Sequence, residues 1–356
     1  MSATRPTLTP ARRRARLFGV IGVIAATGAA LAAQSATEGT AAAWCSPAGI
    51  LRADTLPGTV SPADCDLRGR EIASGSAHLT VPAPGSGISA LEGTAGGGES
   101  TLILLTAPNG SVTITRQTPE DHETPANTPA NTPANDAGGP AGGGAATATS
   151  AAATTAACRD GSYTTMGYKF TGRFDWYLNS SGTPGYLRPS ALSTIATATA
   201  DVARGSNKCG LARKPKLSQR YAGGTSRRPQ ISAAGSCTSR GDGVSVTGWM
   251  KLPRVLAYTC SYYKWNGRSW VVSESDMAMS TSFSWFTGRI PSRCSYTFDL
   301  RGVVVHERGH TFGLGHVDSR THGSLTMSPY SAPCTTVNRA LGYGDYRGLS
   351  LMYGVS

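Results

Sequence analysis

The sequence lacks several patterns that would place it in common structural classes. Its eight cysteines contain no C-x-x-C pair, which argues against a zinc site built from cysteine. The apolar run over Leu17–Ala33 is broken by glycine and is short for a membrane span, so we expect no stable membrane anchor. Histidine is scarce, since the chain of 356 residues has six and none lies between Cys158 and Val305. A metal site that uses several imidazoles must therefore draw on the few histidines that remain.

Three of the six histidines fall in one stretch of eleven residues, His306–His316, which reads H-E-R-G-H-T-F-G-L-G-H. His306 and His310 are four residues apart, so a helix would place both imidazoles on one face. That spacing allows two histidines to bind one zinc ion, with Glu307 beside them as a general base. The structural alternative is a helix that carries solvated histidine and glutamate without any chemical role.

The second half of this stretch predicts a third ligand. Gly313 lets the backbone leave the helix without the steric penalty of a Cβ atom. The chain can then turn and bring His316 back toward the metal. Three protein ligands leave one coordination position for water, which is the arrangement of a catalytic rather than a structural zinc ion. The sequence therefore predicts one catalytic Zn²⁺.

The stretch resembles the zinc signature of the metzincin metallopeptidases. Metzincins have a turn with a methionine under the metal, and Met327, in the segment S-L-T-M-S-P-Y, is similar to it. Within the family the chain is most similar to the matrixin branch, because Pro329 matches the wall of the matrixin substrate pocket. Tyr330 is the second candidate residue of this pocket. Residues 345–354 are similar to the matrixin C-terminal helix, so the resemblance covers about Cys158–Gly354.

The resemblance implies a fold and an activity. The expected fold is an α/β (α+β) catalytic domain over residues 158–356, with a twisted mixed sheet, long helices, a zinc helix and the methionine turn. The expected activity is that of a zinc endopeptidase, in which Glu307 acts as general base on a metal-activated water. We expect a monomer that acts on peptides or proteins and does not bind nucleic acid. Matrixins also carry a second zinc and calcium, but the lack of histidine between Cys158 and Val305 argues against that zinc, and nothing supports calcium.

Residues 1–33 have the character of a signal peptide. Ala30-Leu31-Ala32 offers a cleavage site of small residues at the end of the apolar run. The run is preceded by a basic segment formed by Arg12, Arg13, Arg14 and Arg16. The sequence therefore predicts a secreted, extracellular protein.

The eight cysteines fit an exported protein, since disulfides persist in oxidising compartments. Cys45 and Cys65 stand apart from the other six, which all follow residue 157. The even number in each group predicts one bridge, Cys45–Cys65, before the peptidase-like region and three bridges within it. Six cysteines allow fifteen pairings, and the sequence does not select one.

Residues 34–117 are expected to form a small β-rich region. Residues 77–81, 101–105 and 111–115 have strand character, and Pro108-Asn109-Gly110 is a turn signal. Two interpretations stay open for this region. It is either a pro-segment that blocks the site until it is cut, or a module that binds a cell-surface or protein partner. The second interpretation goes with an alternative function, a secreted zinc-binding protein with weak catalysis.

Charge and composition divide the chain further. Residues 33–157 carry a net charge of −7 and residues 158–356 carry +14, so we hypothesise that the acidic part docks on the basic part before activation. Residues 118–157 form the predicted linker, with three Thr-Pro-Ala-Asn segments followed by a stretch rich in glycine, alanine and threonine. Such a composition buries little apolar surface, so we expect the linker to be disordered.

Beyond residue 158 the pattern predicts strands and helices in alternation. The zinc helix should begin near Asp299, which is a favourable N-cap residue. In metzincins the sheet strand nearest the cleft runs antiparallel to the bound substrate, and Asp276–Thr281 is our candidate for it. The equally weighted alternative is that this segment is an ordinary strand of the sheet. The predicted elements are strands over residues 163–179, 244–251, 255–264 and 269–281 and an amphipathic helix over residues 189–204.

Overall fold

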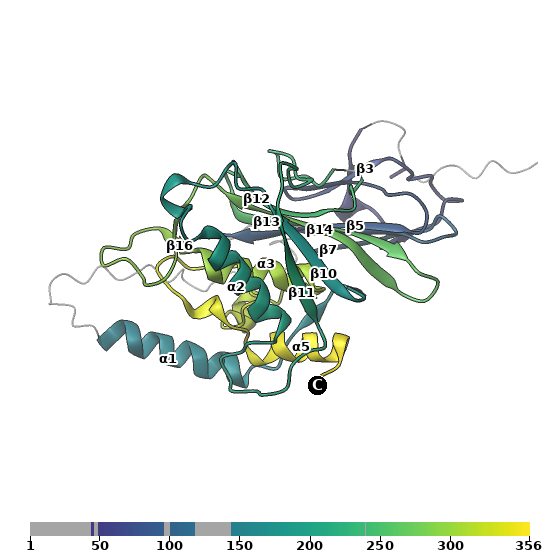
Figure 1. Cartoon of the computed structure of the whole chain (residues 1–356). Coiled ribbons are helices and arrows are strands. Elements are labelled where there is room, and N and C mark those ends of the chain that lie inside the picture. Colours follow the sequence, from purple (N-terminus) through teal and green to yellow (C-terminus); the bar gives the residue numbers. More distant parts are fainter. Residues whose placement is uncertain (1–43, 46–48, 96–99, 118–143, 239) are drawn as a thin grey trace, which may run out of the picture. The chain divides into compact units, whose positions relative to one another are not determined.

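The computed structural model describes residues 44–45, 49–95, 100–117, 144–238 and 240–356 (Figure 1). All of them fall in one structural unit, Ala41–Ser356. The predicted signal peptide, residues 1–33, lies outside the described residues. Within the described ranges, no helix is both long enough and apolar enough to cross a membrane.

The fold is mixed α/β and is organised around one sheet of ten strands. The short strand β9 (Tyr168–Lys169) pairs beside β14, and the other nine strands form a continuous path. Their order is β11 (Ser218–Gly224), β10 (Arg173–Leu178), β12 (Ser245–Met250), β14 (Trp270–Ser280), β13 (Val255–Trp265), β5 (Ser86–Thr94), β6 (Thr101–Thr106), β7 (Val112–Gln117) and β2 (Thr59–Val60).

The sheet has two halves that differ in strand direction. In the C-terminal half, β11, β10, β12 and β14 are parallel, and β13 returns antiparallel to β14. In the N-terminal half, β5, β6, β7 and β2 are all antiparallel to their neighbours. The halves join where β5 pairs antiparallel with β13, from Val255 opposite Thr94 to Lys264 opposite Ser86. The β-rich N-terminal region therefore continues the sheet of the rest of the chain, as Figure 1 shows for β5 and β13.

Apolar side chains cover both faces of this sheet. Leu91 of β5 and Ile103 of β6 belong to the cluster that includes the helices α2 (Ala191–Ala203) and α3 (Leu300–Thr311). Their neighbours Ile88 and Leu102 belong to a second cluster, which the N-terminal region shares with residues of β13. Since successive side chains of a strand point to opposite faces, the two clusters lie on opposite sides of the sheet.

The remaining elements are short or lie around the sheet. The three-stranded sheet consists of β1 (Leu51–Arg52), β3 (Glu71–Ser74) and β4 (Ala77–Thr80). Two small pairs are β15 (Ser284–Phe286) with β16 (Thr297–Asp299), and β17 (Leu314–Gly315) with β8 (Thr164–Thr165). The helices besides α2 and α3 are α1 (Gly144–Arg159), α4 (Ser319–His322) and α5 (Tyr343–Tyr353), with 3₁₀ turns at Ala53–Thr55, Gly185–Leu187 and Val337–Arg339.

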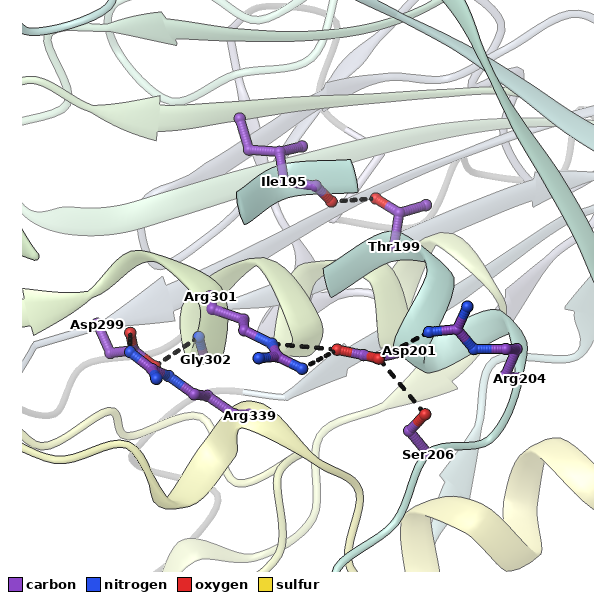
Figure 2. Close-up of polar contacts among 9 residues, drawn as sticks. All are labelled: Ile195, Thr199, Asp201, Arg204, Ser206, Asp299, Arg301, Gly302 and Arg339. Atoms are coloured by element: carbon purple, nitrogen blue, oxygen red, sulfur yellow. Dashed lines mark hydrogen bonds and ion pairs between the residues drawn. The ribbon is translucent and has the colours of Figure 1, made fainter. Parts of the chain in front are cut away.

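Ion pairs fix the start of α3 to the elements around it. Two of the candidate metal ligands, His306 and His310, lie on this helix. Asp201 of α2 is buried and pairs with Arg301 of α3 at 2.6 Å (Figure 2). Asp299 accepts a hydrogen bond from the Gly302 amide at 3.0 Å and pairs with Arg339 at 2.6 Å. The predicted start of this helix near Asp299 is therefore confirmed, and the cap satisfies an amide that the helix itself leaves unpaired.

Most of the predicted elements are present close to their expected positions. The helix predicted over residues 189–204 is α2, and the strand-like runs at 77–81, 101–105 and 111–115 correspond to β4, β6 and β7. The strands expected at 244–251, 255–264 and 269–281 are β12, β13 and β14. The single long strand expected over 163–179 is instead broken into β8, β9 and β10.

The assignment of Asp276–Thr281 to the strand nearest the cleft is wrong. This segment belongs to β14, which pairs with β12 on one side and with β13 on the other. Met277, Ala278 and Met279 are all fully buried, as in a central strand that is covered on both faces. The antiparallel strand on that side of the sheet is β13.

The prediction of disorder is wrong for the last part of the linker, residues 144–157. These residues lie in helix α1, which begins at Gly144 and continues to Arg159. Alanine has the highest helix propensity of all residues, and our argument from composition neglected this. The end of α1 is also fixed by tertiary structure, since Ala157 is fully buried and Cys158 forms a disulfide with Cys209. The rest of the predicted linker, residues 118–143, lies outside the described residues.

The predicted division of the disulfides is confirmed. One bridge joins Cys45 to Cys65, and three bridges lie in the C-terminal region. The structure selects one of the fifteen pairings for these six, namely Cys158–Cys209, Cys237–Cys260 and Cys294–Cys334. All eight cysteines are paired, which indicates an oxidising environment.

A candidate metal centre

The three histidines of the predicted zinc motif meet at one point. Nε2 of His310 lies 3.0 Å from Nε2 of His306 and 3.0 Å from Nε2 of His316, and the last two atoms are 3.2 Å apart. The three residues are 0–2% exposed. A tetrahedral zinc ion bound at about 2.0–2.1 Å holds its ligand nitrogens roughly 3.3 Å apart, so this spacing fits one shared metal ion.

The other ring nitrogens explain why the Nε2 atoms face one another. Nδ1 of His306 lies 2.8 Å from the Thr326 carbonyl oxygen, and Nδ1 of His310 lies 2.9 Å from the Leu314 carbonyl oxygen. Because a carbonyl only accepts, both Nδ1 atoms must carry the proton and both Nε2 atoms must present a lone pair. Lone pairs that converge in a buried site repel one another unless a cation lies between them. The donor set therefore fits a metal ion.

Burial keeps these imidazoles in the form that binds metal. It lowers the pKa of His306 to about 4 and lowers the pKa values of His310 and His316 well below their usual range. The mutual repulsion of the rings lowers the pKa of His310 and His316 further. Neutral histidine is the metal ligand, so no proton has to leave these rings near neutral pH before a metal binds.

His316 reaches the cluster because the chain turns sharply after α3. Gly313 has a φ of +94°, and its amide donates to the carbonyl of His310 at 2.9 Å. A Cβ atom at this position would also collide with the Tyr168 carbonyl oxygen. Glycine is therefore required here both for backbone conformation and for space. The turn places Leu314 and Gly315 in the short strand β17 and His316 directly after it.

His316 is oriented by the N-terminal half of the molecule. Its Nδ1 lies 3.2 Å from Oγ1 of Thr101, the first residue of β6. Sequence reasoning missed this residue, because a lone threonine 215 positions away from its partner carries no local signal. Hydrogen bonds to the outer nitrogen of a ligand histidine fix the direction of the ring, so Thr101 contributes to the shape of the cluster.

Glu307 lies beside the cluster and is fully buried. One of its oxygens, Oε2, accepts a hydrogen bond of 2.5 Å from the Thr259 hydroxyl of β13. Burial raises the pKa of Glu307 to about 8, while the Thr259 hydrogen bond and the charge of Arg308 act in the opposite direction. The other oxygen, Oε1, faces the backbone of Gly93 in β5, where an added Cβ atom would lie 2.5 Å away.

Arg308 anchors α3 on the opposite side from the metal cluster. Its guanidinium donates to the hydroxyls of Thr199 in α2, at 3.1 Å, and Thr247 in β12, at 2.5 Å. The charge also lies over the rings of Phe174 and Trp176, at 5.0 and 5.3 Å. Burial lowers the pKa of Arg308 to about 9. These contacts fix the rotation of α3, and hence the direction in which its histidines point.

Met327 packs beside the residues that adjoin two of the histidines, Gly309 and Val317. It is buried, and a Cβ atom on Gly309, the residue before His310, would collide with its sulfur. The turn is held by the carboxylate of Asp345 in α5, which accepts from the Thr326 amide at 2.8 Å and the Met327 amide at 3.2 Å. Burial raises the pKa of Asp345. The sequence identified the methionine but not the aspartate that fixes its backbone.

Pro329 and Tyr330, the candidate substrate-pocket residues, contact β5. The Pro329 carbonyl accepts a hydrogen bond from the Thr94 amide at 3.2 Å, and the Ser331 amide donates to the Thr94 carbonyl at 3.1 Å. The Tyr330 side chain is 44% exposed. This segment therefore runs alongside the last residue of β5, in parallel with it. The pro-segment interpretation places the N-terminal region at the site, but it does not identify Thr94 as the residue that makes this contact.

Taken together, the described residues hold one cluster able to bind a metal ion, His306, His310 and His316, with Glu307 next to it. No known protein family matches this chain, and no curated protein matches its sequence.

Proposed function

We propose that this protein is a secreted zinc endopeptidase of the metzincin type, most similar to the matrixin branch. The observation that carries the proposal is the convergence of three buried Nε2 atoms within 3.0–3.2 Å, with a glutamate next to the first of them on the same helix. Three neutral imidazoles are the ligand set of catalytic zinc sites that keep one position for water.

The architecture around the site agrees with this proposal. Four parallel strands followed by the antiparallel β13 form a twisted mixed sheet, against which the zinc helix α3 packs. The contact of Met327 with Gly309 supports its proposed role as the methionine of such a turn. Four disulfides are consistent with secretion through the predicted signal peptide.

The residues of the site suggest how the chain would cut a peptide bond. A bound zinc ion would supply Lewis acidity, which acidifies water and polarises a carbonyl group. Glu307 would take a proton from the attacking water and deliver it to the nitrogen of the leaving amine. The Thr259 hydroxyl holds Oε2 of this carboxylate, which leaves Oε1 for the proton transfer.

The substrate would lie in an extended conformation. Main-chain groups on the side of β13 where β5 now pairs would hold it through antiparallel pairing, which makes few demands on its side chains. The Pro329–Ser331 segment would pair with the other side of the substrate. We therefore expect peptides and unfolded proteins to be cut more readily than folded ones.

A second candidate function keeps the metal and omits catalysis. It is favoured by the burial of the site, because Glu307 and the three histidines are 0–2% exposed. In this alternative the protein is a secreted zinc-binding protein, and its N-terminal half binds a cell-surface or protein partner.

Metal content and hydrolysis together separate the two candidates. The chain from residue 34 onward is prepared with zinc, and casein hydrolysis is measured before and after a cut between residues 118 and 143 that is followed by removal of the N-terminal fragment. The endopeptidase should bind one zinc ion per chain and lose hydrolysis with 1,10-phenanthroline. One bound zinc ion without hydrolysis in either state would favour the zinc-binding protein, and a folded sample without zinc would contradict both.

The matched variants are His310→Ala and His322→Ala. The first removes a ligand and should abolish stoichiometric zinc binding. His322 lies outside the cluster, bonded to Asp160 at 2.9 Å, so its loss should leave zinc content at one ion per chain. Equal zinc loss in both variants would point to general unfolding instead of a lost ligand.

A further inference from the structure

The strand β5 covers the edge of β13 that a peptide substrate would need. One side of β13 pairs with β14, and β5 occupies the other side in antiparallel register over nearly its whole length. The last residue of β5, Thr94, also pairs with the Pro329–Ser331 segment, through hydrogen bonds of 3.2 and 3.1 Å. The end of β5 is thus held from both sides, antiparallel to β13 and parallel to Pro329–Ser331.

Between these two contacts, the backbone of β5 crosses the candidate catalytic residues. A Cβ atom on Gly93 would lie 2.5 Å from Oε1 of Glu307 and 3.8 Å from Cδ2 of His306. Only glycine lets the main chain approach the glutamate this closely. The next strand, β6, supplies Thr101, whose hydroxyl contacts His316. The cluster and its glutamate are consequently 0–2% exposed, although a peptidase must admit both water and substrate.

We propose that the N-terminal half, residues 49–117, holds the peptidase in a latent form, with Gly93 and Thr94 in the place of the substrate's main chain. This inference rests on the proposed function. In this form β5 covers the site through backbone hydrogen bonds and through Gly93, which has no side chain and so lies close to Glu307. β5 supplies no side-chain ligand to the metal. Cysteine cannot serve as such a ligand here, because Cys45 and Cys65 are joined in a disulfide. β5 runs antiparallel to β13, which is the direction expected for a bound substrate.

Release of this block does not require breaking a disulfide. Cys45–Cys65 lies wholly before residue 118, and the other three bridges lie within residues 158–334. A cut between residues 118 and 143 would leave the halves joined by strand pairing and by the apolar cluster that they share. Activation therefore has two steps, cleavage of the chain and departure of β5 from β13.

Two substitutions in the full chain test the contact directly. Gly93→Val places a branched side chain against Glu307 and should push the end of β5 away from the cluster. Thr94→Pro removes the amide that donates to Pro329 and should loosen the same end without adding bulk near the glutamate. The matched control is Gly87→Val on the same strand, where an added Cβ would meet Leu105 and Tyr263, at 2.5 and 2.8 Å, instead of the catalytic residues.

Two readouts are taken, the rate at which 1,10-phenanthroline extracts zinc and the rate of casein hydrolysis. In the unaltered chain we expect slow extraction and no hydrolysis. Gly93→Val and Thr94→Pro should each accelerate extraction at least about tenfold, which corresponds to about 1.4 kcal/mol, and should release hydrolysis in at least one of them. Gly87→Val should leave extraction slow.

Each result bears on a different claim. Faster extraction without hydrolysis would support the block by β5 and count against the endopeptidase. Equal extraction rates in the unaltered chain and in both variants, or full hydrolysis by the unaltered chain, would overturn the block. An equal acceleration by Gly87→Val would show that β5 as a whole has come loose, and would overturn the assignment to Gly93 and Thr94.

Discussion

The N-terminal and C-terminal regions of the chain contribute different kinds of groups to the candidate metal centre. The C-terminal half contributes side chains whose type defines the chemistry, namely His306, His310, His316 and Glu307. The N-terminal half contributes mainly backbone, at Gly93 and Thr94, and one hydroxyl, at Thr101. A site can therefore be defined by side chains from one region and closed by the main chain of another. Four substitutions test whether the two regions contribute in these different ways.

The largest effect should come from Glu307→Gln, which removes the general base and retains the shape of the side chain. In the Gly93→Val background, where the site is open, hydrolysis of casein should fall by about 10²–10⁴-fold. Zinc content, measured by atomic absorption, should stay at one ion per chain. Undiminished hydrolysis in this variant would rule out Glu307 as the base.

The second prediction concerns Asp345, whose carboxylate holds the backbone at Thr326 and Met327. Asp345→Ala removes a buried carboxylate that accepts from the amides of Thr326, Met327 and Gly342. Leaving these buried amides without a partner should lower the free energy of unfolding by roughly 3 kcal/mol, as measured by guanidinium denaturation. Asp54→Ala is the control, because that carboxylate pairs with Arg52 at an exposed site and its loss should change stability little. Similar losses in the two variants would contradict the assigned role of Asp345.

The third prediction concerns pH. Glu92 of β5 is 1% exposed, and burial raises its pKa to about 7, against the Ser76 hydroxyl, the Ser100 amide and the charge of Arg254, which lower it. The phenol of Tyr258 and the carboxylate of Glu307 also lie near enough to interact with the groups at this position.

Since the folded pKa is raised, the stability that protonated Glu92 provides is complete below about pH 4.5 and is lost as the pH rises through 7. The loss should be on the order of 3 kcal/mol between pH 5 and 8. Denaturant unfolding of the unaltered chain and of Glu92→Gln across this range measures it. The variant should show the weaker pH dependence, and parallel curves would contradict the prediction.

The smallest effect concerns Thr101, whose hydroxyl contacts His316 of the cluster. Thr101→Val removes the hydroxyl at His316 and should weaken zinc binding by about tenfold. Thr106→Val is the matched control on the same strand, because the Thr106 hydroxyl is buried without a hydrogen-bond partner. Competition with a fluorescent zinc chelator gives both affinities. Equal affinities would show that Thr101 does not orient His316.

The contrast between the halves also explains what the sequence could predict. The spacing of His306, Glu307 and His310, the cap at Asp299 and the turn at Gly313 are local patterns, and each has a direct physical reading. Strands with period-two or strongly apolar patterns, such as β6 and β13, were also recognisable. The parity of the cysteines on either side of the linker predicted how many bridges each region would hold.

The missed features depend on contacts between distant parts of the chain. The strand β5 reads S-G-I-S-A-L-E-G-T, whose glycines and small residues are typical of loops, and only its burial between β13 and β6 makes it a strand. Asp345 looked like an ordinary polar residue of a C-terminal helix, yet its carboxylate is fully buried. The central position of β14 had a signal that we overlooked, since the continuous run Met277-Ala278-Met279 is typical of a strand covered on both faces.

The pairing of β5 with β13 has a consequence for the stability of the activated form against aggregation. Departure of the N-terminal half would leave β13 as an open edge, with a row of unpaired amides and carbonyls beside an apolar surface. Such edges pair with any extended chain, including a second copy of the same protein. The surface that we propose holds substrates is thus also the surface most prone to self-association. While the chain is intact, the N-terminal half would act as a covalently attached chaperone that keeps this edge covered.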